Sequence, residues 1–325
     1  MPLAEAAATR PAGTRGPGTQ MFDNLNLFLE LYPLAIPVTA FIFGSAIGSF
    51  LNVVVYRLPL MLHREWLGQA IEIIEDHDDD PALSRRLRQN LPEQAEPFNL
   101  VVPGSRCPAC GATIRPWHNI PILGYLLLSG KCADCSTPIT ARYPIVEFAT
   151  ALLTMMVVIE FGASWQGLAA CALTWAMITL ALIDYDTQLL PDDVTLLFLW
   201  LGLVVNFFGV FTSFSQAFLG AAGGYMILWT VYQLFKLVTG KEGMGFGDFK
   251  MLAMLGAWLG LKAIPLIILL SSFTGAVVGG ALIATGWSRD KPLKFGPFLA
   301  IAGWIALMWG NDLISLYLDY ALSDV

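Results

Sequence analysis

Charged residues are scarce in this chain of 325 residues. Asp, Glu, Lys and Arg make up 13% of it, whereas soluble domains carry about 25%. Hydrophobic residues make up 56%. The shortage of charge excludes a soluble globular domain and an intrinsically disordered chain. The net charge of −7 also argues against a basic nucleic-acid-binding protein, so no nucleic-acid partner is expected. The composition therefore predicts a polytopic membrane protein whose main solvent is the lipid bilayer.

Several other patterns are missing. The five cysteines are too few for a disulfide-rich secreted module, and the three histidines share no metal-ligand spacing. Residues 1–20 contain no apolar run and so do not resemble a cleavable secretory signal. No strand followed by Gly-x-Gly-x-x-Gly is apparent, which leaves a cofactor-binding site unassigned. The glycine cluster at 220–224 lies in a hydrophobic stretch and is typical of helix packing.

Long charge-free stretches predict about eight transmembrane helices, because a crossing needs about 20 apolar residues. The first is predicted at residues 31–57. The others are predicted at about 144–160, at 161–183, as two spans within 194–235, and at about 248–261, 263–288 and 295–311, the one at about 248–261 being short. Thr212, Ser213 and Ser215 mark the turn inside the charge-free stretch from 194 to 235. The fold class is thus an all-α polytopic membrane protein.

The first and second predicted spans are separated by an insertion at residues 58–143. Between Arg57 and Arg142 lie nine basic and ten acidic residues, which predicts a water-exposed segment. The basic residues of later loops fall on the same side as this insertion, so the positive-inside rule predicts that it is cytoplasmic. Its acidic run, Glu72 to Asp80, is typical of a solvated face, with a basic partner as the alternative. The predicted division is completed by a tail and membrane approach at 1–30, a membrane core at 144–318 and a tail at 319–325.

The insertion carries a cysteine pattern that favours zinc. Cys107-Pro-Ala-Cys110 and Cys132-Ala-Asp-Cys135 offer four thiolates at a spacing suited to a closed, structural tetrahedral site. Two disulfides are the alternative, and the reducing side of a membrane disfavours them. Because the insertion is too charged and Pro-rich to build much of a core, the metal would supply folding free energy. The fifth cysteine, Cys171, lies in an apolar span and is interpreted as a packing residue.

Two carboxylates at the ends of apolar segments are the candidate catalytic residues. Asp184 directly follows a long apolar stretch, and Asp248 directly precedes another. Ionisable groups near hydrocarbon are costly and usually functional. Two facing carboxylates can share one proton and hydrolyse an amide through water. Gly245 and Gly247 would let a substrate backbone approach closely. The alternative is that both aspartates are ordinary loop acids at helix ends.

Seven segments together resemble the type IV prepilin peptidases, which are bifunctional leader peptidases and N-methyltransferases of the bacterial inner membrane. The segments are GSAIGSFLNVVVYRLP at 44–59, the two cysteine pairs, ARYPIVE at 141–147, IDYDTQLLPD at 183–192, GFGD at 245–248 and FGPFLA at 295–300. The resemblance extends from about Phe41 to Gly303.

This resemblance implies an aspartic protease of the Gly-x-Gly-Asp type whose catalytic residues are Asp184 and Asp248. It implies prepilins and pseudopilins as substrates, a short basic leader that is removed, and methylation of the new N-terminal amine by S-adenosylmethionine. It also implies that the insertion contributes to methylation, with Gly130 as a possible contact.

Two other functions stay open at this point. One is a transporter or proton-coupled carrier that uses the same acids, and the other is a non-catalytic zinc-containing subunit of a secretion complex. The oligomeric state is not predicted.

Overall fold

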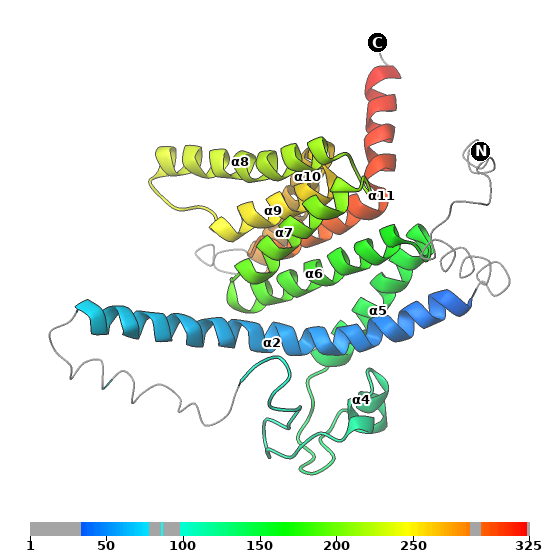
Figure 1. Ribbon diagram of the computed structural model, residues 1–325, viewed down its shortest axis with the longest axis vertical. Helices are drawn as coiled ribbons and strands as arrows, with labels where there is room; N and C mark the ends of the chain where they lie inside the picture. Colours follow the sequence, from blue (N-terminus) through cyan, green and yellow to red (C-terminus); the bar gives the residue numbers. More distant parts are fainter. Residues whose placement is uncertain (1–33, 78–85, 87–97, 287–293, 324–325) are drawn as a thin grey trace.

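A computed structural model describes residues 34–77, 86, 98–286 and 294–323 (Figure 1). Within these ranges the chain is helical, with two isolated β-bridges and no strand. The elements are α2 (Ala35–His77), η1 (Pro116–Asn119), α4 (Leu123–Leu127), α5 (Arg142–Phe161), α6 (Trp165–Thr187), α7 (Asp192–Phe207), α8 (Phe214–Thr239), α9 (Phe246–Leu259), η2 (Leu261–Ala263), α10 (Ile264–Ala284) and α11 (Gly296–Ser323).

Six helical segments of the described chain are long and apolar enough to cross a membrane. They are α2, α5, α6, α8, η2 with α10, and α11. The prediction of an all-α polytopic membrane protein is therefore confirmed. The prediction of about eight crossings is not, because α7 and α9 have only 16 and 14 residues, fewer than the about 20 that a crossing needs. Ser213 caps α8 through a bond from the Gln216 N–H, so the predicted turn between α7 and α8 is confirmed.

Helix α2 continues well past the first predicted span. It runs for 43 residues, with Pro59 inside it, and reaches His77. Charged residues mark where the chain leaves hydrocarbon but do not end a helix, because Arg, Glu and Leu are all good helix formers. The acidic residues of the final turns, Glu72, Glu75 and Asp76, are exposed, as expected of a solvated face. Residues 78–80 of the acidic run lie outside the described residues.

Helix α9 lies at the centre of the second half of the bundle, where it packs against α7, α8 and α11 (Figure 1). Every residue from Met251 to Trp258 is buried. Glycines allow the closest contact, since a Cβ at Gly220 of α8 would lie 2.4 Å from the carbonyl oxygen of Gly256 of α9. A Cβ at Gly224 would lie 2.7 Å from the Leu252 oxygen. The interpretation of this glycine cluster as a packing stripe is confirmed.

A buried amide holds the far end of α9 in place. The Asn206 side chain donates to the carbonyls of Ala257 and Trp258, both at 2.8 Å. Its oxygen accepts bonds from the N–H groups of Phe211 and Thr212, both at 3.0 Å. All four of its hydrogen-bonding positions are therefore used, which is what makes a polar group tolerable at 1% exposure.

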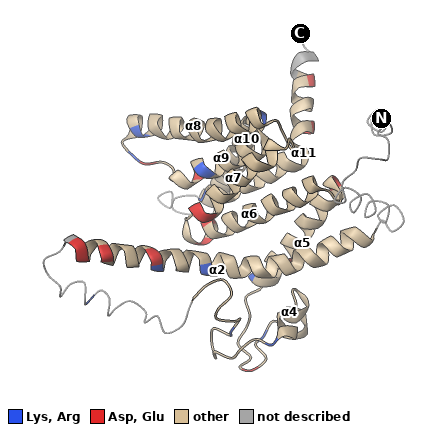
Figure 2. Cartoon of the chain, viewed as in Figure 1, with Lys and Arg blue, Asp and Glu red and all other residues tan. Residues whose placement is uncertain are grey.

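Most of the charged residues in the described helices lie toward one end of the bundle (Figure 2). At this end α2 leaves the bundle, α6 and α8 finish, and α7 and α9 begin. The remaining length of the helices is largely uncharged, as the membrane requires. The two candidate aspartates belong to this charged end, because one is in the last turns of α6 and the other in the first turn of α9.

A substitution at Gly220 tests whether glycine is needed for the close packing of α8 on α9. In Gly220→Ala the new methyl group would overlap the Gly256 carbonyl, so the two helices must separate, at a cost of about 1–3 kcal/mol. We expect a lower aggregation temperature for the detergent-solubilised protein. The matched control is Gly280→Ala, because nothing lies within 4 Å of a Cβ at Gly280. Equal aggregation temperatures for the two variants would contradict this account of the interface.

Candidate active site

Asp184 and Asp248 come together in one cavity. They are 6% and 8% exposed, respectively. Both line a cavity of about 930 Å³ that is open on one side and is bordered by α2, the segment from 188 to 193, the start of α9 and Lys294. Two carboxylates from distant parts of the sequence thus face a common space large enough for several residues of a peptide.

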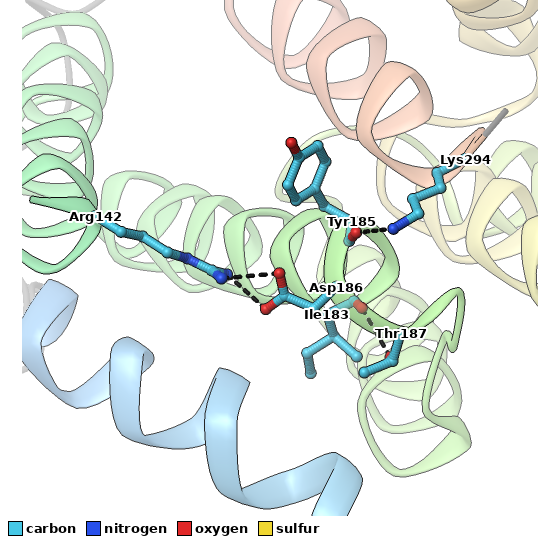
Figure 3. Close-up of polar contacts among 6 residues, drawn as sticks. All are labelled: Arg142, Ile183, Tyr185, Asp186, Thr187 and Lys294. Atoms are coloured by element: carbon cyan, nitrogen blue, oxygen red, sulfur yellow. Dashed lines mark hydrogen bonds and ion pairs between the residues drawn. The ribbon is translucent and has the colours of Figure 1, made fainter. Parts of the chain in front are cut away.

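Three neighbouring residues at the end of α6 are each held by a different part of the chain. Asp184 Oδ2 accepts a bond at 3.0 Å from the N–H of Gly296, the first residue of α11. The Lys294 ammonium donates to the Tyr185 carbonyl and lies over its ring. Arg142 makes two bonds to Asp186, at 2.8 and 2.6 Å. Figure 3 shows the last two contacts on either side of the helix end. The position of Asp184 is therefore strongly constrained.

The two aspartates differ in their surroundings. Asp184 has the Gly296 N–H and the nearby charge of Lys294 as partners. Asp248 lies outside the six candidate spans, and burial followed by the charge of Asp184 raises its pKa to about 7, opposed by the Gly245 backbone. Such a difference lets one carboxylic acid and one carboxylate coexist near neutral pH. The arrangement can polarise a carbonyl with one group while the other takes a proton from water.

The two glycines of the GFGD segment have different roles. Gly247 lies against Leu190, and a Cβ there would come within 2.8 Å of the Leu190 Cβ. Glycine at 247 therefore lets the start of α9 approach the α6–α7 connection. Gly245 is the N-cap of α9 and has no atom within 4 Å of a Cβ position. Both glycines line the cavity, and Gly245 leaves its backbone accessible there.

Two further acids stabilise the frame around the cavity. Asp186 is held by Arg142, and Asp192 binds the Lys250 ammonium at 2.7 Å, joining the first turns of α7 and α9. Asp193 also lines the cavity and has no ion pair within the described residues. The carboxylates of Asp192 and Asp193 lie in the first turn of α7, where they complement the helix dipole.

The four predicted metal ligands also converge. The sulfurs of Cys107, Cys110, Cys132 and Cys135 all lie within 4.8 Å of one another, and those of Cys107 and Cys135 are 3.8 Å apart. Zinc with four bonds of about 2.3 Å requires about 3.8 Å between sulfurs in a tetrahedron. All four thiols are free, so the alternative of two disulfides is wrong. The donor set fits a structural metal ion.

The segment around these cysteines, residues 105–139, is called the cysteine module here. It contains a short internal repeat. The N–H groups of Cys107 and Cys132 bond to the carbonyls five residues later, at Ala112 and Thr137. Each cysteine carbonyl also accepts a bond four residues on, from Gly111 and Ser136, which have φ of 72° and 59°. The two halves therefore present their thiolates in equivalent turns, as paired metal-binding loops do.

A hydrogen bond attaches the cysteine module to the bundle, because the buried carboxylate of Glu147 in α5 accepts the Ile122 N–H at 2.7 Å. The start of α5 is in turn joined to α2, since the Asn52 amide donates to the Tyr143 carbonyl at 3.2 Å. Within the module, Gly130 has φ of 71°, and a Cβ there would lie 2.9 Å from the Tyr125 hydroxyl. Backbone conformation thus accounts for glycine at 130, and its contact with a cofactor stays a prediction.

Several residues around the site were not predicted as functional from the sequence. Arg142 and Lys294 were visible only as charges at span ends, and Glu147 only as a rare acid in an apolar segment. The cavity wall contributed by Leu62, Glu65 and Trp66 was missed because α2 was expected to end near residue 57.

Comparison with known proteins identifies the family. Residues 42–161 match the family described as Bacterial Peptidase A24 N-terminal domain, and residues 171–280 match the Type IV leader peptidase family. No solved structure matches the chain. Proteins named prepilin leader peptidase/N-methyltransferase are 50% identical in Stutzerimonas stutzeri and in Pseudomonas aeruginosa, with 90% of this chain and 98% and 97% of theirs covered. The Neisseria gonorrhoeae protein of that name is 45% identical, with 87% and 93% covered. The chain therefore belongs to the type IV leader peptidase family.

Proposed function

We propose that this protein is a membrane aspartic endopeptidase that removes the short basic leader from type IV prepilins and pseudopilins. It then methylates the new N-terminal residue with S-adenosylmethionine. The observation that carries the peptidase activity is the pair of buried carboxylates, from α6 and α9, that line one open cavity. The relatives' shared name supports both activities.

In the proposed cleavage step Asp184 is ionised and Asp248 is protonated. Asp184 takes a proton from a water molecule, whose oxygen attacks the scissile carbonyl carbon. Asp248 donates its proton to the carbonyl oxygen, giving a neutral tetrahedral intermediate. Collapse of this intermediate breaks the C–N bond: the ionised Asp248 takes back a proton from one of the two hydroxyl groups, and the amide nitrogen leaves with the proton held by Asp184, which restores both aspartates to their starting states. The leader then ends in a carboxyl group and the mature protein in a free amine.

The proposed orientation places this chemistry at the cytoplasmic face of the bacterial inner membrane. The described end of the bundle that carries the aspartates also carries Lys236 in the last turn of α8, Lys241 two residues beyond that helix, and Lys250 and Lys294 in the lining of the cavity. Positively charged residues favour the cytoplasmic side of a membrane. A leader with basic residues would remain on that side while the apolar helix behind it lies in the bilayer.

The cysteine module is proposed to hold a structural zinc ion through Cys107, Cys110, Cys132 and Cys135. A closed site of four thiolates leaves no position for substrate, so the ion would stabilise the fold of the insertion. When bound, S-adenosylmethionine supplies the methyl group that the new amine receives. We propose that the insertion, residues 58–143, shapes the methylation site. The protease core is formed by residues 144–318.

Replacement of either aspartate tests the peptidase. Asp184→Asn and Asp248→Asn should each lower the cleavage rate by at least about 10³-fold, because neither half of the acid and base pair works alone. Cleavage is followed by the mobility of a prepilin incubated with membranes. The matched control is Asp193→Asn, which removes a charge from the same cavity without altering the pair. Normal cleavage by either of the first two variants would exclude the assignment.

The pH dependence follows from the pKa of about 7 for Asp248. The shift is upward, so Asp248 keeps its proton below about pH 7 and loses it as the pH rises through that value. We expect kcat for leader removal to fall on the alkaline side, with an apparent pKa that belongs to the pair. Single-turnover cleavage, with the folded fraction checked at each pH, measures this. A kcat that stays constant between about pH 6 and about pH 9 would contradict the proton assignment.

Metal analysis tests the cysteine module. The purified protein should contain zinc, and Cys107→Ser should lose most of it, because a three-thiolate site is left. Loss of the metal should reduce the folded yield or methylation more than leader cleavage, since the ion is structural. Cys171→Ser is the control, because Cys171 is buried in α6 outside the cluster. Full zinc content in Cys107→Ser would argue against ligation by four thiolates.

A further inference from the structure

The extension of α2 beyond the bilayer forms one wall of the active-site cavity. Leu62, Glu65 and Trp66 line the cavity that contains Asp184 and Asp248. Positions i, i+3 and i+4 of a helix share one face, so these three side chains form a continuous strip. The strip faces a space whose other borders come from α6, α7 and α9. A peptide bound in this cavity can therefore contact the side chains of this wall.

The extension is held in place by apolar packing below the strip. Val54, Val55 and Leu58 of α2 form a buried cluster with Ile183, the residue just before Asp184. Leu62 packs against the same cluster. The wall is therefore fixed relative to the aspartate pair, and its side chains have defined positions in the cavity.

The basic residues of the same helix segment contact a different part of the chain. Arg57 donates to the carbonyls of Asn99 and Pro103, at 2.9 and 2.6 Å. The Arg64 guanidinium lies over the Phe98 ring, 4.2 Å from its centroid. Arg57 and Arg64 are seven residues apart and share a face that does not line the cavity. Among the charged side chains of this segment of α2, the cavity therefore meets only the carboxylate of Glu65.

Most other charges of the cavity have partners. Lys250 is paired with Asp192, and Glu242 is paired with Lys236. Lys294 donates to the Tyr185 carbonyl. The partner of Glu65 is the neutral amide of Gln69, at 3.2 Å, and its charge is not balanced by an ion pair within the described residues. Beside it, the Trp66 side chain is 48% exposed.

We propose that Glu65 and Trp66 form a binding subsite for a lysine or arginine side chain of the substrate leader. A carboxylate attracts the cation, and tryptophan is the aromatic residue that binds a cation best through its ring face. The inference rests on the proposed function, and it assigns a specificity-determining role to residues outside the aspartate pair. The subsite lies on the α2 wall, so it acts on binding of the leader and leaves the chemical step unchanged.

A charge exchange tests the subsite. Glu65→Lys should raise KM for a precursor with a lysine-containing leader by about tenfold, with kcat within about twofold. A precursor whose leader lysine is replaced by glutamate should be a similarly poor substrate for the unaltered protein. Pairing Glu65→Lys with that glutamate leader should restore most of the lost kcat/KM. Trp66→Ala should also raise KM, and Trp66→Phe should raise it less.

Glu72→Lys is the matched control. Glu72 is an exposed acid on the same helix that does not line the cavity, so the same change of charge should leave KM unaltered within about twofold. Equal effects of Glu65→Lys and Glu72→Lys, or no recovery with the exchanged leader, would overturn the subsite.

A binding measurement separates this inference from the proposed function. Anisotropy of a fluorescent leader peptide can be recorded with Asp248→Asn, alone and combined with Glu65→Lys. Weaker binding of the combined variant supports the subsite even if the unaltered protein cleaves no prepilin. Equal binding by both variants would refute the subsite even if cleavage by the unaltered protein establishes the peptidase.

Discussion

The cost of burying negative charge at the end of a membrane bundle governs the architecture of this protein. Asp184 and Asp248 are both more than nine-tenths buried, and an isolated carboxylate in such a place would be expensive. For Asp184, the fold reduces that cost with the Gly296 N–H and the charge of Lys294. For Asp248, it favours the protonated form of the side chain. Each of these solutions is also what hydrolysis needs, because a carboxylate and a carboxylic acid must be present together.

The short length of α9 follows from the same requirement. A helix with Asp248 in its first turn cannot pass through hydrocarbon with that end, so it begins inside the protein at the edge of the bundle. It is then surrounded by α7, α8 and α11. Such burial is possible only because Gly220 and Gly224 let α8 approach its backbone and because Asn206 satisfies the carbonyls at its far end. Packing at one end of α9 thus fixes the carboxylate at the other.

The sequence predicted those features that depend on local pattern. Charge-free length predicted the apolar helices, cysteine spacing predicted the four-cysteine cluster, and acids at apolar boundaries predicted that Asp184 and Asp248 share one site. The prediction of about eight crossings is not confirmed, because it counted α9 as a span, and hydropathy cannot distinguish a helix buried by protein from a helix buried by lipid. Contacts between distant segments, such as Arg142 with Asp186 and Ile122 with Glu147, leave no local signal. The α2 wall was missed for another reason, since charge was taken as the end of a helix when it marked only the end of the membrane.

The position of the acids also separates a peptidase from the other functions that the sequence left open. A carrier that relays protons commonly places its ionisable groups near the midplane, between halves that can rock. Here both aspartates lie at helix ends and line a cavity at the charged end of the bundle. A purely structural zinc subunit would have no use for two buried acids that share one cavity. The family to which the chain belongs supports neither alternative. The geometry of the site and the family of the chain thus agree on a peptidase.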